Sequence, residues 1–174
     1  INNAIPLSGF DNVRPAYQMI KALIRAVPDV QIDKDHMVII SPDEGAMSRC
    51  MYYSSVLGLD IGMFYKRRNY SVVVNGRNPI EAHEYLGQDL HGKDVIIVDD
   101  MISTGGTIVA AAFALREAGA ASVSVACTHG VFVNNAIEKL TSSSLDAVLC
   151  CNTLENEVSN ISVANLIADT IRRG

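Results

Sequence analysis

The feature that most constrains the fold is the regular alternation of short apolar runs with longer amphipathic segments. Short apolar runs predict buried strands, and apolar residues at helical spacing predict helices. We expect strands at 36–43, 59–68, 93–100, 122–130 and 145–151 and an extended segment at 80–87. We expect helices at 13–27, 44–58, 107–120 and 134–142, and a short strand followed by a terminal helix within 160–174. This alternation predicts an α/β fold with a mostly parallel sheet flanked by helices on both faces, a Rossmann-like three-layer arrangement.

Length and composition narrow the class of protein. The 174 residues suit a single domain, 1–174, with an aliphatic core, since 49% of residues are hydrophobic and 6% are aromatic. A net charge of −5 argues against nucleic acid or an anionic membrane as partner. No apolar run approaches the ~20 residues of a membrane span, and no signal peptide is recognisable, so we expect a cytoplasmic location. The four cysteines are expected to be buried and reduced, and Met47, Met51 and Met63 to lie in the core.

Polar residues gather where the expected strands end. Five such clusters occur, at 43–44, 66–68, 99–100, 128–129 and 152–153. In open parallel sheets, ligands bind at the carboxyl ends of the strands. The clusters therefore predict one active edge of the sheet.

The loop Ser103-Thr104-Gly105-Gly106-Thr107 lies between an expected strand and an expected helix. Glycines let backbone N–H groups approach an anion, and a helix N-terminus adds partial positive charge. Thr104 and Thr107 offer hydroxyl donors. The loop predicts a pocket for a phosphate dianion, although it is not a Walker loop because GxxxxGK[ST] is absent. The alternative is a plain glycine turn with Thr107 as the helix cap.

Two adjacent carboxylates, Asp99 and Asp100, directly precede this loop. They would repel a phosphate that touched them, but they can accept hydrogen bonds from sugar hydroxyls or hold Mg²⁺ that screens phosphates. The ligand would then carry a phosphate at one end and a diol or a metal at the other. Ribose 5-phosphate fits this description.

The stretch VIIVDDMISTGGT, residues 95–107, resembles the phosphoribosyl-diphosphate (PRPP) binding motif of the type I phosphoribosyltransferase fold. Other stretches resemble the PRPP synthetase (ribose-phosphate pyrophosphokinase) family in order and approximate spacing: SPDEGAMSR, YKRR, THGVF, CNTLE and VANLIADTIRR. The resemblance covers nearly all of residues 5–173. It implies a type I phosphoribosyltransferase-like fold. It also implies transfer of diphosphate from MgATP to the 1-hydroxyl of ribose 5-phosphate, which gives PRPP and AMP.

The resemblance also implies roles for particular residues. Residues 103–107 would bind the 5-phosphate, and Asp99 and Asp100 the ribose hydroxyls. Asp43 would help hold Mg²⁺, although an Asp at this place is also a typical helix cap. Lys66 and Arg68 would belong to a mobile catalytic loop that stabilises the transition state, and the alternative for them is a solvated, charged strand end.

Two departures from the family pattern qualify this interpretation. Ser103 stands where PRPP synthetases usually carry Asp, and the chain resembles only the C-terminal half of a two-domain enzyme. The fragment is therefore expected to bind ribose 5-phosphate or PRPP but to be inactive alone. The family resemblance implies ATP as the second substrate and a homo-oligomer, a dimer or a hexamer, for the full-length protein. The alternatives are a phosphoribosyltransferase that uses PRPP and a non-catalytic PRPP-synthetase-like regulatory subunit.

Overall fold

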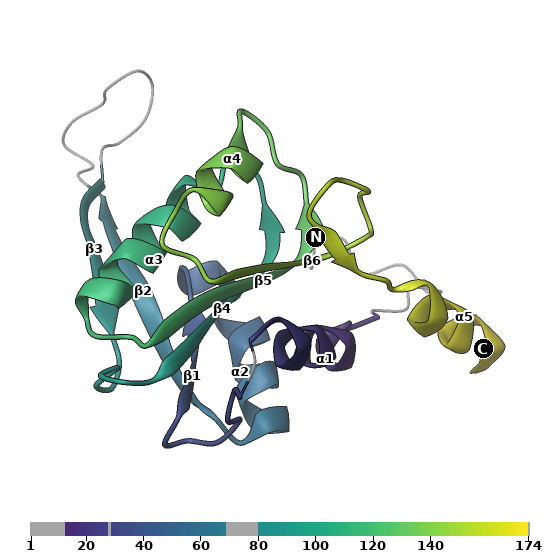
Figure 1. Cartoon of the computed structure of the whole chain (residues 1–174), viewed down its shortest axis with the longest axis horizontal. Helices are drawn as coiled ribbons and strands as arrows, with labels where there is room; N and C mark the ends of the chain where they lie inside the picture. The colour runs from purple at the N-terminus through teal and green to yellow at the C-terminus, as the bar shows by residue number, and fades with distance from the viewer. Residues whose placement is uncertain (1–12, 28, 69–79, 174) are drawn as a thin grey trace.

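Seven strands form a single sheet in the order β3-β2-β1-β4-β5-β6-β7 (Figure 1). The structure is a computed structural model that describes residues 13–27, 29–68 and 80–173, without the side chains of 66–68 and 80–83. The strands are β1 Met37–Ser41, β2 Asp60–Arg68, β3 Ile80–Leu86, β4 Asp94–Ile102, β5 Ser122–Gly130, β6 Ala147–Cys151 and β7 Ser159–Ile161. Only β3 runs antiparallel to its neighbour β2. The predicted mostly parallel sheet is confirmed.

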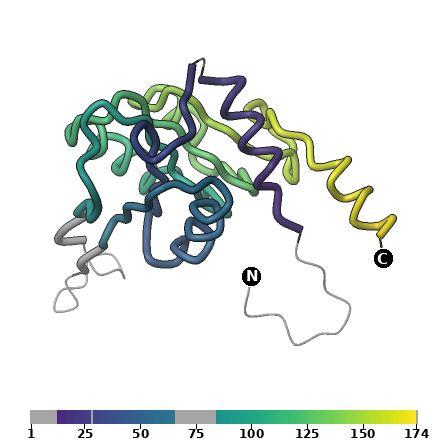
Figure 2. Tube along the Cα trace, turned by 90° about the horizontal axis from the view of Figure 1, so that it is seen from below, coloured from purple at the N-terminus to yellow at the C-terminus, as the bar shows by residue number. Residues whose placement is uncertain are grey.

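Helices cover both faces of this sheet, as predicted. The helices are α1 Ala16–Ala26, α2 Met47–Leu57, α3 Gly106–Glu117, α4 Ala136–Thr141 and α5 Ala164–Arg173. Side chains of α3 and α4 pack on one face and those of α1 and α2 on the other, which gives two buried apolar layers. Figures 1 and 2 show the same division, with α1 and α2 in front of the sheet in Figure 2. The sheet is therefore the middle of three layers.

The buried strands explain the stability of this arrangement. All five residues of β1 are buried, and so are the four apolar residues of β4 from Val95 to Val98. A strand between two helix layers must be apolar on both faces, which is why neither strand alternates with polar residues. Burying a side chain such as Ile97 contributes roughly 1.5–3 kcal/mol. The polar residues that follow these strands are therefore fixed by a rigid core.

Several element boundaries differ from those predicted. The predicted helix 44–58 is divided into a short 3₁₀ turn, Glu44–Ala46, and α2, which ends at Gly58 in the left-handed conformation. The four cysteines are buried, as predicted. The expectation that Met47, Met51 and Met63 lie in the core is wrong, because Met51 is 59% exposed on α2 and the other two are only half-buried.

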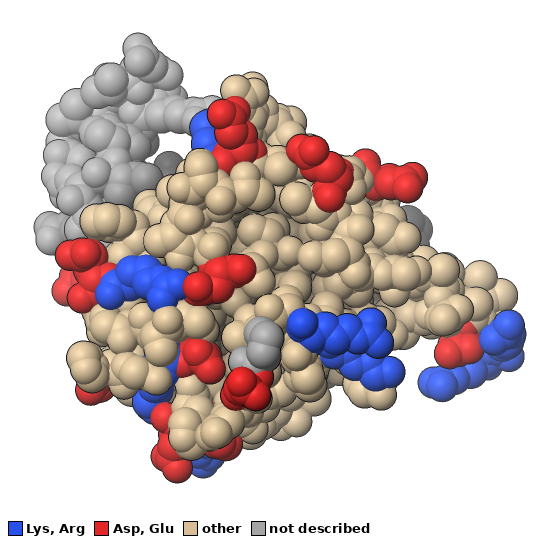
Figure 3. Space-filling view, viewed as in Figure 1, with Lys and Arg blue, Asp and Glu red and all other residues tan. Residues whose placement is uncertain are grey.

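The end of the chain lies away from the core. Helix α5 has no buried residue and projects from the side of the sheet in Figures 1 and 2. Figure 3 shows acidic and basic side chains interspersed over one face of the described molecule. Among the described helices, none is both long and apolar enough to cross a membrane.

Candidate functional site

The sheet reverses its direction of growth between β1 and β4. Strand β1 pairs with β2 on one side and with β4 on the other, and all three are parallel. Such a switch point leaves a crevice at the carboxyl ends of the two central strands, where ligands of α/β proteins bind. Asp43 follows β1, and Asp99 and Asp100 lie near the end of β4. The predicted placement of polar residues at the carboxyl ends is confirmed for these two strands, whereas a role of this edge in ligand binding stays a prediction.

The predicted phosphate loop connects β4 to α3. Gly105 precedes the helix with a φ of +73°, and its carbonyl accepts the N–H of Val109 at 3.0 Å. Thr104 and Gly106 are exposed, whereas Gly105 is buried. The strand–loop–helix geometry agrees with the sequence analysis, although the helix begins at Gly106 rather than at Thr107. The first N–H groups of α3, at the positive end of the helix dipole, thus follow directly after the carboxyl end of β4.

A second loop, residues 131–135, supports the phosphate loop. The N–H of Val133 donates to the carbonyl of Ser103 at 3.0 Å, and Leu140 of α4 lies against Gly105. Three residues nearby, Phe132, Asn134 and Asn135, have positive φ. Sequence reasoning missed this support. The only signal for it was the Asn-Asn pair, because asparagine tolerates the left-handed conformation better than most residues.

The two carboxylates form an ion-paired cluster with Arg49. Its guanidinium lies 2.8 Å from Asp100 Oδ2 and 3.5 Å from Asp99 Oδ1, and the N–H of Asp100 donates to Asp99 Oδ1 at 2.8 Å. Burial raises the pKa of Asp99 to about 7, helped by the negative charges of Asp100 and Asp43. Arg49 had no predicted role. The signal was present, because Arg49 is the last residue of the quoted motif SPDEGAMSR.

Asp43 caps the short turn that precedes α2. Its Oδ1 accepts the N–H of Ala46 at 3.1 Å, and its carbonyl accepts the hydroxyl of Ser41 at 2.7 Å. The capping alternative is therefore confirmed. Since the second carboxylate oxygen is not used by this cap, a role in metal binding stays a prediction.

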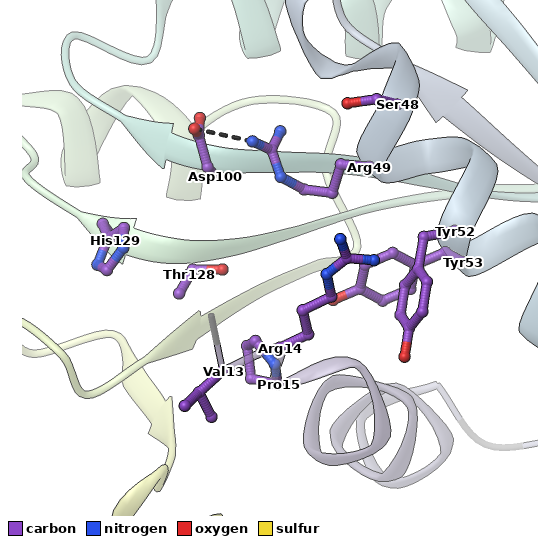
Figure 4. Close-up of a pocket in the computed structure, with 10 residues that line it drawn as sticks. All are labelled: Val13, Arg14, Pro15, Ser48, Arg49, Tyr52, Tyr53, Asp100, Thr128 and His129. Carbon is purple, nitrogen blue, oxygen red and sulfur yellow. Dashed lines mark ion pairs between the residues drawn. The ribbon is translucent and has the colours of Figure 1, made fainter. Parts of the chain in front are cut away.

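A pocket opens beside Asp100, with a cavity volume of about 200 Å³. Figure 4 shows Arg49 pointing from α2 toward Asp100. Thr128 and His129 of β5 also line this pocket. His129 Nδ1 lies 2.8 Å from the hydroxyl of Thr153, and His129 also lines the pocket. Arg14 lies over the ring of Tyr52, 4.6 Å from its centroid.

Lys66 and Arg68 lie near the end of β2, where their backbones pair with His83 and Ile80 of β3. Their side chains are outside what the structure describes, and so is the segment 69–79, which contains the hairpin-like Asn75-Gly76. The predicted catalytic role of both cations stays a prediction.

Residues 10–166 match the phosphoribosyl transferase domain family. The ribose-phosphate pyrophosphokinase of Methanothermobacter thermautotrophicus is 42% identical over 138 residues, 79% of this chain and 46% of that protein. The protein of the same name from Helicobacter pylori is 40% identical over 141 residues, 78% of this chain and 42% of that protein.

A solved structure agrees with these relatives. The phosphoribosylpyrophosphate synthetase of Mycobacterium smegmatis aligns with a TM-score of 0.72 and 30% identity, over 91% of this chain and 50% of that one. The chain therefore spans half or less of the length of these three proteins. On the match of its residues 10–166, the chain belongs to the phosphoribosyl transferase domain family.

Proposed function

We propose that this chain binds ribose 5-phosphate and PRPP as the C-terminal half of a ribose-phosphate pyrophosphokinase. The complete enzyme would transfer diphosphate from MgATP to the 1-hydroxyl of ribose 5-phosphate and release AMP. The observation that carries the proposal is the loop 103–107 at the start of α3, next to the carboxylates of Asp99 and Asp100. The names of the curated relatives support this reaction over the alternatives of a phosphoribosyltransferase or a regulatory subunit.

Each part of the site would act on one part of the sugar phosphate. The hydroxyl of Thr104 and the N–H groups at the start of α3 would donate to the 5-phosphate, where helix-end charge favours an anion. The carboxylates of Asp99 and Asp100 would accept the ribose hydroxyls. Catalysis in the complete enzyme would rest on positioning and on neutralising the charge of the transferring phosphates, with Lys66 and Arg68 as the cations.

Magnesium is the cofactor of this proposal. The carboxylates of Asp43, Asp99 and Asp100 are hard oxygen donors, and Mg²⁺ in such sites is bound by one or two carboxylates together with substrate phosphates. The described residues contain no group of three His, Cys, Asp or Glu side chains able to hold a metal by themselves. The ion would therefore bind together with the phosphates, whose negative charge it would neutralise. A cytoplasmic location and a homo-oligomeric full-length enzyme are part of the same proposal.

Calorimetric titration tests the binding half of the proposal. The chain is titrated with ribose 5-phosphate and then with ATP, both in the presence of Mg²⁺. We expect ribose 5-phosphate to bind, ATP to bind little, and the Thr104→Ala/Thr107→Ala variant to lose sugar-phosphate binding. Thr141→Ala/Thr170→Ala is the matched control, since both hydroxyls bond to helix carbonyls away from the crevice. Equal binding by the two double variants would refute the phosphate role of the loop.

The catalytic half requires the full-length protein. AMP released from ATP and ribose 5-phosphate would support a pyrophosphokinase. Pyrophosphate released from PRPP and a nucleobase would support a phosphoribosyltransferase instead. A full-length protein that forms neither product would support the regulatory alternative.

A further inference from the structure

The guanidinium of Arg49 is the only described cation in ion-pair contact with Asp99 and Asp100. It approaches Asp100 Oδ2 at 2.8 Å and Asp99 Oδ1 at 3.5 Å. Each carboxylate therefore keeps a second oxygen that Arg49 does not use. Two adjacent carboxylates repel each other, and a shared guanidinium reduces that repulsion while it fixes the direction of both groups.

Helix α2 holds this guanidinium in place. The residue after Arg49, Cys50, is fully buried, and its thiol lies 3.5 Å from the carbonyl of Val98 in β4. One turn further along, the buried Tyr53 donates its hydroxyl to the sulfur of Met19 in α1 at 2.8 Å. These two anchors set the rotation of α2, so that Arg49 is directed at the end of β4 (Figure 4). The side chain of Arg49 is only 22% exposed, which limits competition from water.

We propose that Arg49 is a positioning residue that makes the site specific for a sugar with vicinal hydroxyls, because it orients the Asp99–Asp100 pair toward them. This inference rests on the proposed function. Arg49 would touch the two carboxylates and not the sugar. Its removal should therefore weaken recognition of the hydroxyls and leave recognition of the phosphate unchanged.

The test compares two sugar phosphates that differ in one hydroxyl, with inorganic phosphate as a third ligand that carries no sugar. Calorimetry gives the Kd of ribose 5-phosphate, of 2-deoxyribose 5-phosphate and of inorganic phosphate for each variant. In the unchanged chain we expect a preference of at least roughly tenfold for ribose 5-phosphate, the lower limit for one hydrogen bond to a charged group. In Arg49→Gln we expect this preference to fall to about twofold or less, with the Kd of inorganic phosphate unchanged. Arg49→Lys, which keeps the charge but loses the fork of donors, should lie between the two.

The matched control is Arg116→Gln. Arg116 also pairs with an aspartate, Asp146, but at the amino end of β6 and with additional bonds to the carbonyls of Ala121 and Ser144. This variant should be less stable and should keep the full preference for ribose 5-phosphate. A loss of preference in both arginine variants would indicate general loosening of the fold and would overturn the inference.

The remaining outcomes separate this inference from the proposed function. If the unchanged chain discriminates between the sugars and Arg49→Gln discriminates equally well, the positioning role is refuted and the sugar-phosphate site stands. If the unchanged chain binds neither sugar phosphate, both are refuted. If Arg49→Gln does not fold, Arg49→Lys decides, and a preference equal to that of the unchanged chain refutes the role.

Discussion

The adjacent glycines of the phosphate loop should respond in opposite ways to the same substitution. Gly105 has a φ of +73°, and a Cβ at this position would lie 3.3 Å from Cγ of the buried Leu140. The left-handed conformation costs an L-residue with a Cβ about 1–2 kcal/mol of conformational free energy. Leu140 can move little to make room for the Cβ because it is only 1% exposed. Gly105→Ala should therefore destabilise the fold by about 2 kcal/mol.

Gly106 begins α3, and a Cβ there would meet no protein atom closer than Thr104 Oγ1 at 4.0 Å. Alanine is the better helix former, so Gly106→Ala should leave the fold unchanged or stabilise it by up to about 1 kcal/mol. The added methyl group would instead occupy space that a bound phosphate needs for close approach to the backbone N–H groups. We expect binding of ribose 5-phosphate to weaken at least tenfold, about 1.4 kcal/mol.

Urea denaturation and calorimetric titration of both variants check these values. A destabilisation of about 2 kcal/mol in Gly105→Ala should lower Tm by about 4–8 °C in a chain of this size. A Gly105→Ala variant as stable as the unchanged chain would contradict the strain expected at Gly105. Unchanged affinity of Gly106→Ala for ribose 5-phosphate would mean that Gly106 serves the turn alone.

Two further predictions concern the carboxylates. Burial raises the pKa of Asp99 from 3.8 to about 7. Between these two pH values, Asp99 therefore holds a proton in the folded chain but has released it in the unfolded chain. The free energy of unfolding should therefore fall as pH rises from about 4 to about 7, and Asp99→Asn should flatten this slope in urea titrations; an identical slope in the variant would contradict the assignment. Asp43→Asn should keep the cap and its stability but weaken Mg²⁺-dependent binding, whereas Asp43→Ala should also lose about 1 kcal/mol of stability. If the Asp43→Asn variant shows the same Mg²⁺ dependence of ligand binding as the unchanged chain, the role of Asp43 is limited to capping the turn.

The sheet and the loop 103–107 were predictable because each depends on residues that are close together in the sequence. The apolar run from Val95 to Val98 defines a strand, and Gly105 and Gly106 mark the turn into a helix. The layered α/β fold follows from such runs, since the helices α1 to α4 bury their apolar faces on the sheet. Element ends were less predictable, as the turn that Asp43 caps shows, because a cap depends on one hydrogen bond rather than on periodicity.

The missed features depend on contacts between segments that are far apart in the chain. The pair of Arg49 with Asp100 requires the relative placement of α2 and β4, which no local pattern encodes. The same holds for the contact of Leu140 with Gly105, which places α4 behind the phosphate loop. Met51 was wrongly assigned to the core because its hydrophobicity was considered without the face of α2 on which it lies.

The pairing of β1 with β4 has a consequence for how the chain folds. Met37 pairs with Asp94, so the two strands meet only after the chain has passed through β2 and β3. Such a long closure is entropically unfavourable, and non-local pairing slows folding. Residues 43–49 follow β1 and residues 99–107 follow the buried part of β4, so the two segments come together only when these strands pair. By contrast, β4, α3 and β5 are consecutive and can associate early. We therefore expect the crevice to be completed late in refolding, and a ligand that binds it to stabilise the fully paired sheet over any partly folded form.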